Sequence, residues 1–150
     1  MTNSLPDPQT AVHSVTVRPA LRADLVAIAA LIEPFVAQGR LLRRTIDELE
    51  TLLAHVFVAE AAGRIVGCAA VEIYSPKLAE LRSLAVEAAW QGQGVGKLLV
   101  QACVERARER NVLEVMTITS AEGFFKSCGF DFTLPGEKKA LFVQTRHDAG

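Results

Sequence analysis

The sequence predicts an α/β fold, in which one mixed central β-sheet carries helices on both faces. Three segments with β character, Val56–Ala61, Arg64–Tyr74 and Leu78–Val86, follow one another through short turns, as in an antiparallel meander. A glycine-rich bend then leads into a long amphipathic helix that starts near Val95. The stretch Val112–Thr119 alternates again, and a right-handed crossover through the helix makes it a parallel neighbour of the third segment.

The composition indicates one soluble, cytoplasmic domain. The chain has 150 residues, of which half are hydrophobic and 22% charged, and its net charge of -1 argues against a nucleic-acid partner. Three widely spaced cysteines favour reduced thiols over a disulfide scaffold or a metal site. No apolar run reaches the roughly 20 residues that span a bilayer, so we expect no membrane contact. We expect a flexible tail over residues 1–13, without a secretory signal, and one domain over 14–150.

The first half of the chain predicts a strand and two helices. A short strand at Val15–Val17 is stopped by Pro19. Apolar residues then recur at helical spacing from Leu21, and Pro34 is expected to break this helix. A second helix is expected over Ile46–Leu53. The loop between these helices carries three arginines: Arg40, Arg43 and Arg44.

The second half predicts two helices and further strands. The helix after the bend has an apolar stripe formed by Val95, Leu98, Leu99, Ala102, Cys103 and Ala107. A capping box predicts a short helix from Ser120, and Gly129 is expected to end it in a left-handed conformation. Closing strands are expected at about Phe132 and at Ala140–Thr145.

The bend itself has the pattern of an anion site at the start of a helix. It is not a dinucleotide fingerprint, because Lys97 stands where the third glycine belongs, and it is not a P-loop, because Leu98 follows Lys97. Glycines let the backbone approach a ligand closely, and the first amides of a helix lack internal partners. A pyrophosphate suits such a place. A ligand-free turn from strand to helix is the alternative.

The wider sequence resembles the GCN5-related N-acetyltransferase (GNAT) superfamily over about Val15–Arg146. The run LAELRSLAV, QGQGVG and KLLVQACVERA resembles its motif A, and AEGFFKSCGF resembles its motif B. The resemblance implies a GNAT-type domain whose parallel strands splay to admit acetyl-CoA, the co-substrate. It implies that the pantetheine arm lies along Leu84, Ala85 and Val86. It implies a pyrophosphate held by Gln91, Gly92, Gln93, Gly94, Val95, Gly96 and Lys97.

The same resemblance suggests the catalytic groups. Glu80 matches the position of a general-base glutamate, with Glu72 a weaker candidate. Alternatively, Glu80 is an ordinary strand residue that faces solvent or pairs with Arg82. Many relatives protonate the leaving thiolate with a tyrosine of motif B, but Phe125 stands there and has no proton to donate. Water, Tyr74 or Ser127 are the open alternatives, and Cys128 is expected to pack rather than react.

The loop GRLLRRT, the strand AELRSLAV and the FF of motif B resemble small stand-alone N-acetylglutamate synthases. This implies direct acetyl transfer to the α-amino group of glutamate, as in arginine biosynthesis. Arg44 and Arg82 would hold the carboxylates, with Lys77 a possible third contact, although the loop arginines can also be merely solvated. The resemblance also suggests a homodimer. The competing hypotheses are acetylation of another small amine or a protein amine, and a non-catalytic acyl-CoA-binding module.

Overall fold

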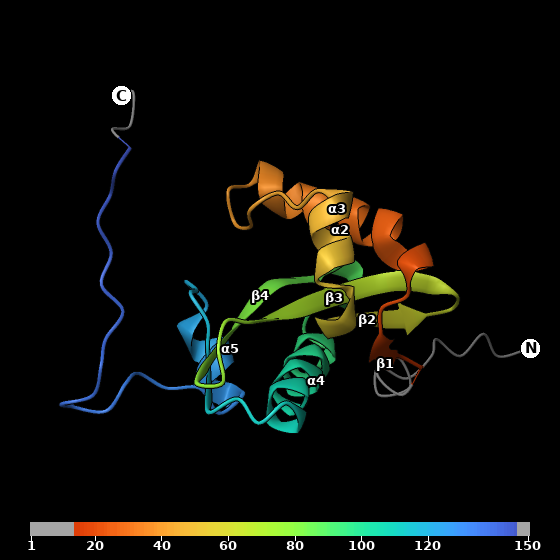
Figure 1. Ribbon diagram of the computed structural model, residues 1–150. Coiled ribbons are helices and arrows are strands. Elements are labelled where there is room, and N and C mark those ends of the chain that lie inside the picture. The colour runs from red at the N-terminus through yellow and green to blue at the C-terminus, as the bar shows by residue number, and fades with distance from the viewer. Residues whose placement is uncertain (1–13, 147–150) are drawn as a thin grey trace, which may run out of the picture. The chain divides into compact units, whose positions relative to one another are not determined.

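The computed structural model describes residues 14–146, so the predicted tail over residues 1–13 lies outside the described residues (Figure 1). The chain divides into two compact units at Ser120. Residues 14–120 contain the whole β-sheet, and residues 121–146 contain one short helix. Each unit is described by itself.

The first unit is built on a five-stranded mixed sheet in the order β1-β2-β3-β4-β5. The first four strands are antiparallel and β5 runs parallel to β4, which confirms the predicted mixed sheet. Ala62 and Gly63, both at positive φ, close the β2–β3 hairpin as predicted. The strands are β1 (Thr16–Pro19), β2 (Val56–Ala61), β3 (Arg64–Ile73), β4 (Leu78–Val86) and β5 (Glu114–Met116).

Helices cover both faces of this sheet, with α2 and α3 on one face and α4 on the other (Figure 1). A buried cluster joins Ile28 and Ile32 of α2 and Leu49 of α3 to Cys68 and Ala70 of β3. On the opposite face a Cβ placed on Gly67 would lie 2.9 Å from Leu99 of α4, so glycine permits the close packing. The helices are η1 (Arg22–Asp24), α2 (Leu25–Ala37), α3 (Ile46–Thr51), η2 (Leu53–His55), η3 (Ala88–Trp90) and α4 (Val95–Glu109).

The prediction that Pro34 breaks the first helix is wrong, because α2 continues through it to Ala37. Pro34 lies in the last turn, where its missing N–H costs one hydrogen bond, that to the carbonyl of Ala30 one turn earlier. The helix is terminated by Gly39, which lies two residues beyond Ala37 and has a φ of 71°. Its N–H donates to the carbonyl of Val36 and that of Arg40 donates to Phe35, the pattern of a Schellman motif.

The second unit contains α5 (Glu122–Ser127), which starts two residues later than predicted, with Ala121 as its N-cap. Its end is as expected: Gly129 has a φ of 94°, and Phe130 donates to the carbonyl of Phe125 at 3.0 Å. The rings of Phe125 and Phe130 pack edge to face with centroids 5.4 Å apart.

The predicted closing strands are absent from the described residues up to 146, and β5 is limited to Glu114–Met116 instead of the predicted Val112–Thr119. Apolar alternation makes a segment compatible with a strand. A strand also requires a neighbouring backbone that accepts and donates its hydrogen bonds.

Candidate active site

The glycine bend connects β4 to α4 and leaves open space in front of the helix start. Gly92 and Gly94 have φ angles of 75° and 86°, in the left-handed region that favours glycine, and Gly94 is the N-cap of α4. A Cβ added at either position would meet nothing within 4 Å. The first N–H groups of this 15-residue helix have no intrahelical partners. The bend therefore fits an anionic group such as a pyrophosphate.

The glutamine side chains of the bend bond to the chain itself. The Gln91 amide donates to the carbonyl of Val86 at 2.8 Å, and the Gln93 amide donates to that of Ala89 at 3.0 Å. These two bonds tie the bend to the end of β4 and to η3. An anion at this place would therefore be held chiefly by backbone N–H groups, with the glutamines fixing their positions.

β4 and β5 separate before β4 reaches the bend. Their register ends with the pair Glu80–Met116, and within residues 14–120 the remainder of β4 has no strand partner on that edge. Further along, Ser83 adopts a φ of 57° and the register with β3 shifts, which identifies a β-bulge. The segment predicted to contact the pantetheine arm, Leu84–Val86, lies directly after this bulge at an exposed strand edge.

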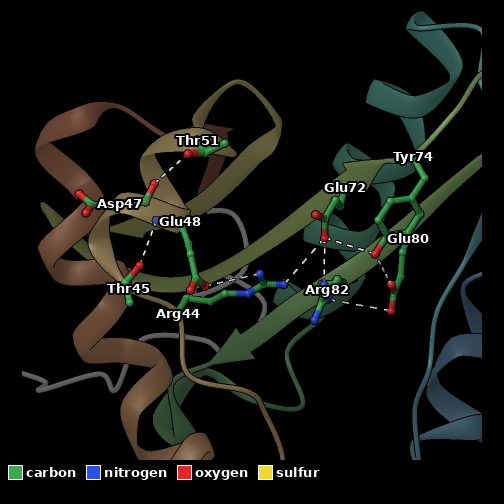
Figure 2. A network of polar contacts seen from close by, with 9 residues as sticks. All are labelled: Arg44, Thr45, Asp47, Glu48, Thr51, Glu72, Tyr74, Glu80 and Arg82. Carbon is green, nitrogen blue, oxygen red and sulfur yellow. Dashed lines mark hydrogen bonds and ion pairs between the residues drawn. The ribbon is translucent and has the colours of Figure 1, made fainter.

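A charged network of six residues lies on the α2 and α3 side of the sheet, next to this separation (Figure 2). Glu72 of β3 and Glu80 of β4 are register partners, and like charges in that position repel. Arg82 offsets the repulsion, because its Nη1 donates to Glu72 Oε2 at 2.9 Å and its Nε lies 4.0 Å from Glu80 Oε2. The network comprises Arg44, Glu48, Glu72, Tyr74, Glu80 and Arg82.

Tyr74 links the two carboxylates. Its hydroxyl lies 2.6 Å from Glu80 Oε1, to which it donates, and 3.3 Å from Glu72 Oε2. Burial of the hydroxyl, followed by the hydrogen bond to Glu80 and the two negative charges, raises the pKa of Tyr74 to about 12. The phenol therefore stays protonated at every pH at which the protein would work.

Arg44 reaches this network from the loop before α3. Its side chain is only 11% exposed, and its Nη2 lies 4.0 Å from Glu72 Oε2 while its Nη1 lies 3.8 Å from Glu48 Oε2. Among the described residues, Nε and Nη2 of Arg44 are buried without a hydrogen-bond partner. Two buried guanidinium donors without an acceptor suit a planar carboxylate.

The other predicted cations lie apart from the network. Arg43 pairs with Glu33 of α2 at 2.6 Å on an exposed surface. Arg40 stacks over the Phe35 ring and lines, with Gln91, an open groove of about 960 Å³ beside α2. Lys77 lies on the exposed turn between β3 and β4, and it is not a member of the network. The structure therefore brings Arg44 and Arg82 together, without Lys77.

Comparison with known proteins identifies the fold. A model of the acetyltransferase (GNAT) domain matches residues 53–131, which include the bend, the separating strands and most of the network. This chain belongs to the GNAT acetyltransferase family. GNAT enzymes use acetyl-CoA as co-substrate, and the open space at the bend and the unpaired edge of β4 are compatible with such a ligand. The GNAT resemblance and the predicted fold class are thus confirmed.

Three relatives are informative. An uncharacterized N-acetyltransferase of Chlorobaculum tepidum is 38% identical over 76% of this chain and 74% of its own length. An amino-acid acetyltransferase of Pasteurella multocida is 29% identical over 89% of this chain, which spans only 32% of that enzyme. The crystal structure of N-acetylglutamate synthase from Neisseria gonorrhoeae, complexed with coenzyme A and N-acetyl-glutamate, superposes with a TM-score of 0.69. It is 30% identical over 75% of this chain and 27% of that one.

Two features of the GNAT domain were only partly foreseen from the sequence. Glu72 was considered as a weaker base, whereas in the structure its Oε2 is the shared acceptor of the network. A second ion cluster, in which Arg18 holds Asp24 and Glu60, was not foreseen.

Within residues 14–146 no group of His, Cys, Asp or Glu is arranged to hold a metal ion. No described helix has the length and apolar character needed to cross a membrane.

Proposed function

We propose that this GNAT domain is an amino-acid N-acetyltransferase that moves the acetyl group of acetyl-CoA to the α-amino group of glutamate. The observation that carries the proposal is Arg44, whose buried Nε and Nη2 lack an acceptor and which lies in one network with Arg82 and Glu80. The names of the Pasteurella and Neisseria enzymes support it. The product would serve arginine biosynthesis.

In this assignment acetyl-CoA supplies the thioester. The backbone from Gln91 to Lys97 holds its pyrophosphate, and the edge of β4 at Leu84–Val86 holds its pantetheine arm. Glu80 lies at the last pair before β4 and β5 separate, so it stands where the exposed edge begins. The backbone thus binds the donor, and charged side chains bind the acceptor.

Glu80 is the proposed general base. A carboxylate beside the amine takes up the proton that the amine loses as it attacks the thioester carbonyl. The new N–C bond forms as the C–S bond breaks, and coenzyme A leaves as a thiolate. The hydrogen bond from Tyr74 to Glu80 fixes the orientation of the carboxylate.

The proton for the leaving thiolate comes from water in this proposal. Phe125 has no proton to donate, and the pKa of Tyr74, at about 12, lies well above the ~8.5 of an ordinary thiol. A phenol of that pKa is a poor acid toward a thiolate. In this proposal Tyr74, whose hydroxyl hydrogen is already donated to Glu80, positions that carboxylate.

The experiment is a thiol-release assay with acetyl-CoA and a panel of acceptors: glutamate, glutamine, aspartate, glycine, spermidine and a lysine peptide. We expect kcat/KM to be highest for glutamate. If glycine, spermidine or the peptide react as well as glutamate, the amino-acid assignment is wrong. Coenzyme A binding without transfer to any acceptor would identify a non-catalytic acyl-CoA-binding module instead.

A further inference from the structure

Glu72 occupies the place at which a substrate carboxylate would be expected. Its Oε2 accepts from Arg82 Nη1 at 2.9 Å, and it lies 3.3 Å from the Tyr74 hydroxyl oxygen and 4.0 Å from Arg44 Nη2 (Figure 2). The two arginines assigned to the acceptor thus already face a carboxylate of the protein itself.

The charge balance of the network opposes a second anion. Arg44 and Arg82 contribute two positive charges and Glu48, Glu72 and Glu80 three negative ones, so the sum is -1. An acceptor with one carboxylate can use the Nε and Nη2 of Arg44, which have no hydrogen-bond acceptor among the described residues. An acceptor with two carboxylates must bring the second one close to Glu72, which competes for the donors of Arg82.

We infer that Glu72 is a specificity-determining residue, whose charge reduces the preference of the site for glutamate over its neutral amide, glutamine. The inference rests on the proposed glutamate acceptor and adds to it the residue that sets how strongly the second carboxylate is favoured. Replacement of Glu72 by a neutral residue frees Arg82 for the second carboxylate. The preference should then move toward glutamate and away from glutamine.

The test is the ratio of kcat/KM for glutamate to that for glutamine. We expect the ratio to rise about tenfold or more in Glu72→Gln, because a like charge a few ångströms from the second carboxylate is removed. Glu72→Asp keeps the charge and should keep the wild-type ratio. Glu48→Gln is the matched control: Glu48 also pairs with Arg44, at 3.8 Å, but its side chain is 49% exposed and it makes no ion pair with Arg82.

Melting temperatures identify variants that fail to fold, and Glu72→Ser offers a second neutral replacement if the glutamine variant does so. An unchanged ratio in a folded neutral variant overturns the inference, as does an equal loss with both acceptors, which a purely structural role for Glu72 predicts. These outcomes leave the amino-acid assignment intact. If the wild-type protein acetylates neither acceptor, the proposed function itself is wrong, and the inference is wrong with it.

Discussion

The Tyr74 hydroxyl donates a 2.6 Å hydrogen bond to the carboxylate of Glu80 on the neighbouring strand. The two residues are six positions apart in the sequence, and the β3–β4 hairpin brings them together. The bond holds one oxygen of the carboxylate in place and leaves the other oxygen to face Arg82. We therefore expect the two residues to differ sharply in their effect on catalysis.

Glu80→Gln should lower kcat by about 100-fold or more, the usual contribution of a general base. Coenzyme A affinity should stay within about twofold of the wild type, because the proposed cofactor contacts are backbone groups elsewhere on β4 and the bend. Initial rates and calorimetric titration measure the two quantities. Glu105→Gln, an exposed glutamate of α4 paired with Arg108, is the control. A Glu80→Gln enzyme with normal kcat would remove Glu80 from the mechanism.

Tyr74→Phe should lower kcat by only about 3- to 10-fold, the value of one hydrogen bond. The Michaelis constant for acetyl-CoA should not change. Because the pKa of Tyr74 is about 12, the wild-type rate should show no loss from phenol ionisation up to pH 9 or 10. A loss of more than about 100-fold on substitution would instead indicate that Tyr74 protonates the thiolate.

Arg44→Lys should raise the Michaelis constant for the amino acid about tenfold or more, because lysine keeps the charge but loses the planar fork. Arg43→Lys is the matched control, since Arg43 is adjacent in sequence but pairs with Glu33 away from the network. Steady-state kinetics with varied amino acid and saturating acetyl-CoA measure the effect. Equal constants for the two variants would show that Arg44 does not bind the acceptor.

Gly94→Ala should weaken coenzyme A binding about tenfold. Alanine at a φ of 86° is strained by about 1–2 kcal/mol, so the bend and the helix start shift. Gly63→Ala introduces similar strain at a φ of 74° in the β2–β3 hairpin, also with no atom within 4 Å of the added Cβ. Both variants should lose comparable stability in thermal unfolding, but only Gly94→Ala should lose affinity. Equal affinity losses would mean that the bend has no special part in binding.

Asp24→Asn should lower the free energy of unfolding by about 1–3 kcal/mol at neutral pH. Asp24 is nearly buried and accepts from both terminal nitrogens of Arg18, at 2.7 and 3.1 Å. The hydrogen bond from Arg18 lowers the pKa of Asp24 below its usual 3.8. Burial opposes this by raising the pKa, and the hydrogen bond from the Leu21 N–H lowers the pKa further. A lowered pKa gives stability that is present above pH 4 and is lost as the pH falls through the folded-state value.

Denaturant titrations at several pH values test this linkage. The free energies of unfolding of the wild type and of Asp24→Asn should converge as the pH falls, because the wild type then loses the ionised carboxylate as well. If the difference between the two free energies of unfolding stays constant from pH 7 to pH 3, the charge of the Asp24 carboxylate contributes nothing to stability.

The spacing of apolar residues and the turn residues predicted most of the fold, because both depend on short stretches of sequence. The bounds of β2 and β4 and the start of α4 agree with the sequence interpretation. The predicted helix end at Pro34 is wrong, because a proline near the end of a helix costs the helix little stability. Gly39 terminates the helix instead. The expected strand at Ala140–Thr145 failed for a different reason. Strands depend on a partner, and no local pattern specifies one.

The sequence predicted which residues belong to the site, but it did not predict how they are arranged. Arg44, Glu80 and Arg82 were identified as candidates, but the central position of Glu72 depends on the β3–β4 register, which places it opposite Glu80. Whether a loop arginine is solvated or buried is likewise a tertiary property. Arg43 and Arg44 are neighbours in sequence, yet only Arg44 turns toward the sheet.

The bulge at Ser83 allows the acceptor specificity of such a protein to change independently of its acetyl-CoA binding. One extra residue puts the side-chain alternation of Leu84–Val86 out of phase with that of Leu78–Arg82, so Arg82 and Ala85 share a face. On the proposed assignment, the first segment recognises the amino acid and the second holds the pantetheine arm of acetyl-CoA. Evolution can then exchange residues such as Arg82 or Glu72 to recruit new acceptors, while the donor half of the same strand is inherited unchanged.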